Sequence, residues 1–517
     1  MRRVVVAITA LLVVLGGAVV VGYLLLFSAV ADRAARATPA DTALYVNAYL
    51  QPSAGQQMNL FGLVGHLRGF GDPASLEAKI DEVAGRLLGQ AAIDYTADVR
   101  PWLGTQIAVG FAPGEGGSPP TLLLFAAVKD SAEARRAVPR LFGAMDITFM
   151  AETFRGRKVM LSDSTSYALL DDLLVVASTP ERLRASLEAD ADIAPSLADS
   201  AAFIAGMGTV ASDHLASVYL DMPRAASLPE GQLLGGFGTA VLALTADADA
   251  LHLHGTAAFT ASGASKEARA AFALGTQSST LAGWMPRTSA AEVVLFGAAQ
   301  SFEDLEASLA GNSGFGRAID ALNQLRAIAA LGLGISFNHD LLPLFDGDGA
   351  VALQRLDADG FHGPVLLRPS DGSAAQASLD RMRSALADRG SKVTTRSVAG
   401  TTLTSVSVPQ IGTVAYALLD GVVIVAVDAA DVAAALEAHA AGETLASDDR
   451  YRSAFELTGA HAGNQLWADI PTLVDVLAGF FDPGSELRDI LHQIGELAII
   501  ATATDDRLEI DGALTVK

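Results

Sequence analysis

The longest feature of the hydrophobic pattern is an uncharged run at the N-terminus. It extends from Val4 to Ala31 and follows Arg2 and Arg3. An apolar helix needs about 20 residues to cross the hydrocarbon core of a bilayer, so this run is long enough to span it. Positive residues mark the cytoplasmic end of such a span. The pattern therefore predicts a membrane anchor within residues 1–31, with the rest of the chain outside the cytoplasm.

A cleaved signal peptide is the alternative interpretation of the same run. The sequence Ala29-Val30-Ala31 has the small-x-small pattern of a cleavage site. The apolar part of a signal peptide is usually only about 7–15 residues, and the longer run here favours a retained anchor. Retention predicts a single-pass protein that contacts the lipid bilayer through residues 4–31. Cleavage near Ala31 predicts a secreted protein.

Beyond this run, short segments of alternating apolar and polar positions lie between segments of helical spacing. Tyr167–Asp171 and Leu173–Ser178 predict a hairpin, and Pro180–Ala189 predicts a helix directly after it. Asp130 is expected to cap an earlier helix that runs to about Phe142. The other main strands predicted in this half are Ala43–Leu50, Gln106–Phe111, Thr121–Val128, Leu215–Asp221, Ala240–Asp247 and Ala250–Thr260. Hairpins dominate and helices separate groups of strands, so we expect an α+β fold with an antiparallel-rich sheet.

The same pattern occurs twice along the chain. Tyr167–Ala189 matches Tyr416–Ala438 without a gap, and eleven of these 23 positions are identical. Self-similarity of this kind is the signature of a repeated unit. We therefore predict a tandem duplication with copies at 38–262 and 284–517, joined by a linker at 263–283. Each copy is expected to be an antiparallel-rich sheet packed with helices.

Several of these features together resemble a known family. They are the hairpin at Tyr167–Asp171 with its following helix, the openings of the two copies at Pro39 and Pro286, and the single N-terminal span. In these respects the chain is similar to the bacterial exported proteins grouped as domain of unknown function 3352. The resemblance covers nearly the whole chain after the anchor. It implies an extracytoplasmic, membrane-tethered protein and brings no catalytic residues with it.

Composition and charge exclude several classes of protein. Hydrophobic residues make up 51% and charged residues 18%, which excludes a disordered chain. The 58 acidic residues outnumber the 35 basic ones and give a net charge of −23, so the sequence is not that of a nucleic-acid binder with a basic patch. The chain has no cysteine, which excludes disulfides, thiolate metal sites and cysteine nucleophiles. No motif predicts a catalytic residue or a cofactor.

The weak candidates for a metal site are Asp346 and Asp348, in the sequence Asp346-Gly347-Asp348-Gly349. This sequence resembles part of a calcium loop, but the further ligands and the closing glutamate of such a loop are missing. Glycine and aspartate are also typical of a turn before a strand, which is the simpler interpretation. The matching place in the first copy has Gly104 and Thr105, so the fold does not require the acid pair.

The segment between Pro471 and Ile494 is the candidate surface for a ligand or a partner. Its apolar residues recur at helical spacing, and Asp482-Pro483-Gly484 is expected to divide it into two helices. Packing on the core is the simpler interpretation of such spacing. Two phenylalanines are adjacent, however, so one faces away from the core unless something covers it. The candidate surface consists of Leu477, Phe480, Phe481 and Leu487.

Three functions stay open at this point. The leading hypothesis is a non-catalytic binding or scaffold module, tethered to the membrane, with an unknown protein or lipid partner outside the cytoplasm. The second is a carrier of an apolar ligand such as a lipid, suggested by the apolar helical segments. The third is a hydrolase whose catalytic residues come together only in three dimensions, since the chain contains no G-x-S-x-G and no H-E-x-x-H motif.

Overall fold

The computed structural model describes residues 32–67, 85, 93–114, 119–144, 147–225, 237–260, 277–297, 299, 326, 336–357, 360–408, 412–478, 485–504 and 506–517. The chain forms two compact units. Apart from the last two residues of the chain, unit 1 ends at Thr260 and unit 2 begins at Ala261. The predicted anchor at 1–31 lies outside the described residues. Within the described part of the chain, no helix is both long and apolar enough to cross a membrane.

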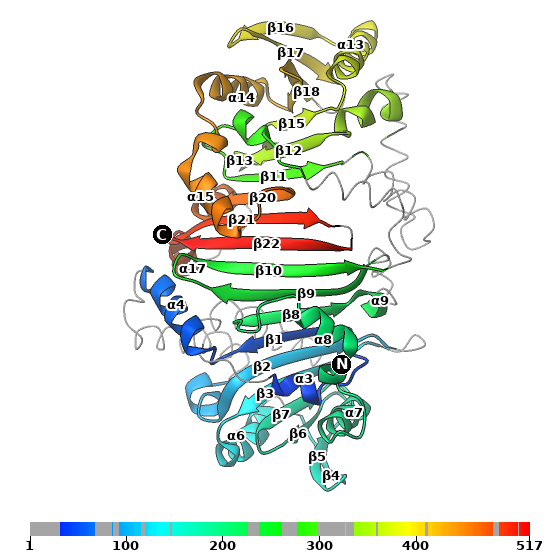
Figure 1. The fold of residues 1–517 in the computed structure, drawn as a ribbon, viewed down its shortest axis with the longest axis vertical. Coiled ribbons are helices and arrows are strands. Elements are labelled where there is room, and N and C mark those ends of the chain that lie inside the picture. The colour runs from blue at the N-terminus through cyan, green and yellow to red at the C-terminus, as the bar shows by residue number, and fades with distance from the viewer. Residues whose placement is uncertain are drawn as a thin grey trace. The chain divides into compact units, whose positions relative to one another are not determined.

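Unit 1 is built on a sheet in which neighbouring strands are antiparallel. Its strands are β1 (Leu44–Tyr49), β2 (Leu103–Ala112), β3 (Thr121–Val128), β4 (Met150–Phe154), β5 (Arg157–Leu161), β6 (Ser166–Leu169), β7 (Leu173–Ala177), β8 (Ala216–Asp221), β9 (Phe237–Ala246) and β10 (Ala250–Phe259). Hydrogen-bonded neighbours follow the order β10-β9-β8-β1-β2-β3-β7-β6-β5-β4. The first strand therefore lies inside the sheet, where Tyr45 of β1 is opposite Gly110 of β2 and Tyr219 of β8 (Figure 1).

Helices cover both faces of this sheet. They are α3 (Arg33–Ala37), α4 (Ala54–Gly65), the π-helical turn η2 (Tyr95–Val99), α6 (Ser131–Ala144), α7 (Pro180–Asp190), the short turn η4 (Leu197–Asp199), α8 (Ala201–Met207) and α9 (Met222–Ala225). The helices α3, α7 and α8 bury one face around Phe125 and Leu187. On the other face, η2 and α6 pack around Trp102 and Ala126, and α4 packs against Ala48. The odd and even positions of β3 thus face different cores.

Unit 2 also has an antiparallel sheet. Its strands are β11 (Ala291–Phe296), β12 (Asp348–Leu353), β15 (Val365–Arg368), β16 (Val393–Val398), β17 (Thr401–Val408), β18 (Gly412–Leu419), β19 (Val422–Ala426), β20 (Asn464–Asp469), β21 (Ile494–Ala503) and β22 (Arg507–Val516). Hydrogen-bonded neighbours follow the order β21-β20-β11-β12-β15-β19-β18-β17-β16. A small separate hairpin joins β13 (Arg355–Asp357) to β14 (Gly360–His362).

The helices of unit 2 again lie on both faces of the sheet. They are η6 (Leu281–Trp284), η9 (Phe337–Leu341), η10 (Leu342–Phe345), α13 (Gly372–Asp388), α14 (Ala429–Ala441), η11 (Leu445–Ser447), α15 (Asp449–Thr458), α16 (Ile470–Leu477) and α17 (Ser485–Leu491). On one face, η6, α14 and α15 surround the fully buried Trp467. On the other, α13 and η10 pack around Leu379 and Val423.

Local sequence signals account for several of these elements. The turn between β18 and β19 is formed by Asp420 and Gly421, with φ of 50° and 78°. A two-residue hairpin turn of this kind needs positive φ at both positions, which Asp and Gly tolerate best. Thr179 caps α7, and its hydroxyl accepts the backbone N–H of Arg182. These observations confirm the predicted hairpins and the α+β class.

Candidate functional site

The first described residues fold back into the core of unit 1. Asp32 Oδ1 accepts three hydrogen bonds, from the backbone N–H of Ala35 at 2.9 Å, the Tyr45 hydroxyl at 2.6 Å and Gln106 Nε2 at 2.6 Å. Burial raises the pKa of the Asp32 carboxyl, and these hydrogen bonds offset part of the rise. The core residues contributed by α3 are Ala34, Ala35 and Ala37. The helix α3 is therefore part of the folded unit and not a loose leader to it.

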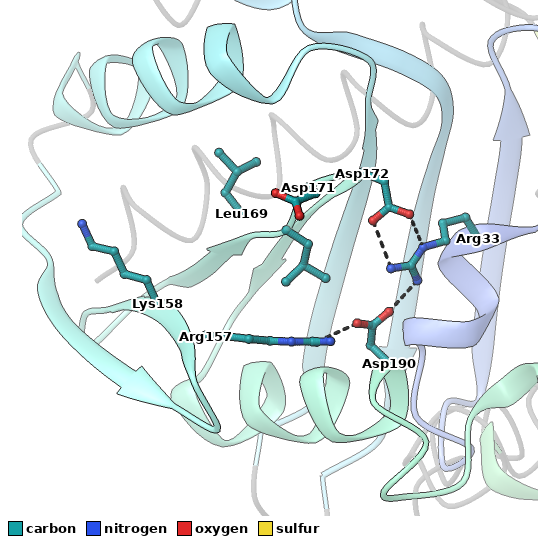
Figure 2. A pocket seen from close by; sticks show the side chains of 8 residues that line it. Arg33, Arg157, Lys158, Leu169, Asp171, Asp172 and Asp190 are labelled. Carbon is teal, nitrogen blue, oxygen red and sulfur yellow. Dashed lines mark hydrogen bonds and ion pairs between the residues drawn. The ribbon is translucent and has the colours of Figure 1, made fainter.

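Arg33 extends from α3 into a network of ion pairs (Figure 2). Its Nε and Nη2 donate to the Asp172 carboxylate at 2.7 and 3.2 Å, and its Nη1 lies 2.5 Å from Asp190 Oδ1. The other oxygen of Asp190 accepts a hydrogen bond from Arg157 Nη1 at 2.6 Å. The hydrogen bonds from Arg33 hold the pKa of Asp172 below its usual value. The network thus connects α3 to β5, to the β6–β7 turn and to the end of α7.

A pocket of about 320 Å³ lies beside this network. Leu169 and Leu170 supply its apolar lining. Its charged lining residues are Arg33, Arg157, Lys158, Asp171, Asp172 and Asp190 (Figure 2). Such a mixture of fixed charges and a small apolar surface is suited to binding a polar ligand.

The matching hairpin of unit 2 lacks the two basic residues that β5 contributes to this pocket. In unit 1, the turn Arg155-Gly156 has φ of 50° and 79° and leads into Arg157 and Lys158. In unit 2, the turn Ala399-Gly400 has φ of 47° and 80° and leads into two threonines at 401 and 402. The two turns therefore have the same backbone geometry, but two basic residues follow the first and two uncharged residues follow the second.

Two of the three acidic residues of the pocket are also specific to unit 1, whereas Asp171 corresponds to Asp420 of unit 2. In the gapless sequence match, Asp172 corresponds to Gly421, and the residues directly after the match are Asp190 in unit 1 and His439 in unit 2. The His439 ring stacks on Trp284 with centroids 3.5 Å apart, and its Nδ1 lies 2.7 Å from the Gly283 carbonyl oxygen. Unit 2 thus uses a ring contact where unit 1 uses ion pairs, so the fold itself does not require the charged pocket.

The structure places the two metal candidates in separate contacts. Asp346 accepts hydrogen bonds from the backbone N–H of Ser370 at 2.9 Å and from its hydroxyl at 2.5 Å. Asp348 is buried at the start of β12, where it accepts the Ser279 hydroxyl at 2.6 Å and lies 3.7 Å from Arg368. Each carboxylate stabilises the turn before β12. Among the described residues, no three or more His, Cys, Asp or Glu side chains are grouped to hold a metal ion.

The candidate ligand or partner surface is only partly described. Leu477 is half-buried at the end of α16, and Leu487 belongs to α17, although its side chain lies outside the described part of the structure. Phe480 and Phe481 lie outside the described residues altogether. Asp469 caps α16 through a 3.1 Å hydrogen bond to its first turn. The helix α16 itself has no fully buried residue, although most of its side chains are apolar.

Sequence reasoning also missed the buried acid Glu292. It is 1% exposed in β11, where it pairs across the sheet with Trp467 of β20 and Ala352 of β12. Burial raises the pKa of Glu292 to about 7, and the Tyr451 hydroxyl offsets only part of this rise. The Trp467 indole N–H is buried with no hydrogen-bond partner. The burial of Glu292 could have been found from the period of two along β11, because side chains two residues apart on a strand share a face and Glu292 therefore faces inward with Val294.

The described residues define an α+β protein of two units, each an antiparallel sheet with helices on both faces. The chain belongs to the family described as "Protein of unknown function (DUF3352)", which matches residues 4–512. No curated protein matches it. Among solved structures, crystal form I of TP0453 is 11% identical, with 46% of this chain and 81% of that chain covered and a TM-score of 0.25. Crystal form III is 12% identical, with coverage of 46% and 83% and a TM-score of 0.26. Likenesses this weak say nothing further about the fold.

Proposed function

We propose that the protein is a membrane-tethered binding or scaffold module that works outside the cytoplasm. In this proposal residues 4–31 span the bilayer, with the N-terminus in the cytoplasm and both units outside. The observation that carries it is the docking of α3, because the chain enters the core of unit 1 directly after the hydrophobic run. Asp32 and Arg33 are both fixed by contacts with distant residues of unit 1.

The packed helix α3 directly after the predicted span fits a short, rigid connection to the membrane better than a flexible stalk. A stalk would need polar, glycine- or proline-rich residues without packing after the span. Here Asp32 is held by Tyr45 and Gln106, and Ala34 and Ala35 lie in the core. A span that ends directly before the capped start of α3 would leave almost no free chain between the bilayer and unit 1, and would therefore restrict the orientation of unit 1 at the bilayer surface.

The topology of the tether is tested by two measurements on the full chain. A reporter that is active only outside the cytoplasm, fused after Lys517, is expected to be active. Mass spectrometry of the membrane fraction is expected to recover peptides from residues 4–31. Recovery of a mature N-terminus at Asp32, with no peptide from the run before it, would instead establish a cleaved signal peptide.

We also propose that the two units arose by tandem duplication. Strand pairing supports this, because each pairing between neighbours from β9 to β4 in unit 1 has a counterpart between β21 and β16 in unit 2. An isolated bridge joins Pro39 to Ser196 in unit 1, and another joins Pro286 to Thr444 in unit 2. Ser196 and Thr444 each open a short helical turn with a capping box. Unrelated units would not share details of this kind.

A second candidate function, carriage of an apolar ligand, is favoured by α16. The side chains of Leu473, Val474, Val476 and Leu477 are all only partly buried. Apolar helices that pack fully on a core normally bury one stripe of residues. Partial exposure along α16 leaves apolar area for a lipid or a partner to cover.

The variant Phe480→Asp/Phe481→Asp distinguishes contact of the two rings with a ligand or partner from packing of the rings in the core. If the two rings contact a ligand or a partner, the variant is expected to fold normally and lose a co-purifying lipid or protein. If they pack in the core, the melting temperature should fall strongly, because two buried charges and a cavity together cost several kcal/mol. Unchanged folding together with unchanged co-purification would contradict both roles.

A further inference from the structure

The core of unit 2 contains buried polar atoms that have no hydrogen-bond partner among the described residues. They are both carboxyl oxygens of Glu292 and the indole Nε1 of Trp467. Glu292 is 1% exposed and Trp467 is 0% exposed, so neither side chain reaches solvent to an appreciable extent. Buried polar atoms without a partner destabilise a fold, and nearly all such atoms in folded proteins are bonded to a protein group or to an ordered water. These atoms therefore point to something bound beside them.

The two side chains face the same part of the core. Glu292 of β11 pairs directly with Trp467 of β20. Side chains of directly paired residues lie on one face of the sheet, with Cβ atoms about 4.5–5.5 Å apart. Tyr451 of α15 packs over this face, and the centroid of its ring lies 5.4 Å from that of Trp467. Burial raises the pKa of Glu292, and the Tyr451 hydroxyl close to the carboxyl lowers it in part. Three polar groups therefore surround one small region between two strands and a helix.

The chemistry of these groups selects a small molecule that both donates and accepts hydrogen bonds. The Trp467 indole can only donate, an ionised Glu292 carboxylate can only accept, and the Tyr451 hydroxyl can do both. The indole N–H disfavours a metal cation, and the carboxylate disfavours an anion. Because Glu292 and Trp467 are almost fully buried, a larger ligand that extends to solvent does not fit this position.

We propose that one water molecule is bound between Glu292, Trp467 and Tyr451 as an integral part of the core of unit 2. It accepts the indole N–H of Trp467 and donates to the carboxyl of Glu292, with the Tyr451 hydroxyl as the third partner. Buried waters typically make about three hydrogen bonds to groups that are otherwise unpaired. The water links β11, β20 and α15, which come from distant parts of the sequence of unit 2.

Unit 1 has a different set of side chains at the matching places. Its first strand pairs Tyr45 with Tyr219, as the first strand of unit 2 pairs Glu292 with Trp467. The Tyr45 hydroxyl donates to Asp32 Oδ1 at 2.6 Å, so this buried polar group has a protein partner. The shared strand order therefore does not require the Glu292 site, and the bound water is a property of unit 2.

The first test is NMR of the full chain in detergent at pH 8, with ¹⁵N-labelled tryptophan. The variants W467F and W102F identify two of the three indole signals. We expect a nuclear Overhauser cross-peak between the Trp467 indole proton and water, with the sign in the rotating frame that excludes proton exchange. Since the pKa of Glu292 is about 7, its carboxyl proton is lost at pH 8 and cannot relay the signal. Trp102 is the internal control without a cross-peak, because its Nε1 donates to the Asp98 carbonyl at 2.6 Å.

Two variants locate the water. Glu292→Leu removes both carboxyl oxygens, and because it also removes a buried charge at pH 8, we expect it to fold, as its melting temperature checks. The Trp467 cross-peak is expected to disappear in this variant. It should persist in Tyr451→Phe, where two of the three partners remain and no hydroxyl proton can relay the signal. An unchanged cross-peak in Glu292→Leu, its loss in Tyr451→Phe, or no Trp467 cross-peak in the unsubstituted chain would overturn the site.

The second test is a crystal structure of the full chain at a resolution that shows ordered waters. We expect an oxygen peak about 2.7–3.2 Å from both Trp467 Nε1 and a carboxyl oxygen of Glu292. A direct hydrogen bond between these two side chains, with no peak between them, would refute the bound water.

Discussion

Gly363→Ala is expected to prevent stable folding of unit 2. Gly363 has φ of 145°, a conformation that residues with a side chain rarely adopt, and an added Cβ would overlap the carbonyl oxygen of Ala352. The residue lies between β14 and β15, where the Ala352 N–H donates to the Pro364 carbonyl and the Gly363 N–H donates to Asp431. Because the overlap is with backbone, relief requires the two strands to separate. We expect a loss of more than about 3 kcal/mol in the free energy of unfolding.

Urea denaturation followed by tryptophan fluorescence checks this result, since Trp284 and Trp467 are buried in unit 2. The matched control is Gly372→Ala at the start of α13, where an added Cβ meets only an ordinary contact 3.8 Å away. Alanine favours helix over glycine by up to about 1 kcal/mol, so this control should be neutral or slightly stabilising. A denaturation midpoint of Gly363→Ala equal to that of the control would show that the strands can adjust.

The second large effect concerns how the stability of unit 2 depends on pH. Glu292 is buried, and its pKa is raised from 4.5 to about 7. A raised carboxyl pKa means that the folded state holds the proton more tightly than the unfolded state does. The resulting stabilisation is complete below pH 4.5, declines as the pH rises to about 7 and is absent above that. The full difference corresponds to about 3 kcal/mol, because one pKa unit is about 1.4 kcal/mol.

The variant Glu292→Gln removes the titrating group while keeping its shape. Compared with the unsubstituted chain, it should have a similar free energy of unfolding at pH 4.5 and a higher one at pH 8. Urea denaturation at a series of pH values measures the difference between the two chains, in which the other titrating groups largely cancel. The control is Glu437→Gln on the exposed side of α14, for which no such difference is expected. A constant difference between Glu292→Gln and the unsubstituted chain at all pH values would contradict the prediction.

Elements specified by short-range sequence signals were predictable. The Asp420-Gly421 turn, the Thr179 cap of α7 and the Asp469 cap of α16 each depend on residues within a few positions of one another. The order of strands in each sheet was not predictable in this way. It depends on pairings such as Tyr45 with Tyr219, which no local pattern specifies.

The charged pocket was missed for a related reason. In the sequence, Arg33 is simply a charge at the end of the uncharged run, and α3 has only five residues, three of them alanine. The partners of Arg33, Asp172 and Asp190, come from a turn and a helix end much later in the chain. A sequence of two arginines and three alanines does not show that its side chains pack in a core. Only the fold brings these charges together.

The pairing of the first strand of each unit with a late one affects when folding can be completed. Leu44 of β1 pairs with Leu220 of β8, and Ala291 of β11 pairs with Ala468 of β20. During synthesis β1 therefore lacks one of its two neighbours until nearly the whole of unit 1 has emerged. Sheets dominated by such distant pairings fold slowly. Under the proposed export of the chain, this delay would keep unit 1 unfolded while it passes through a narrow translocation channel.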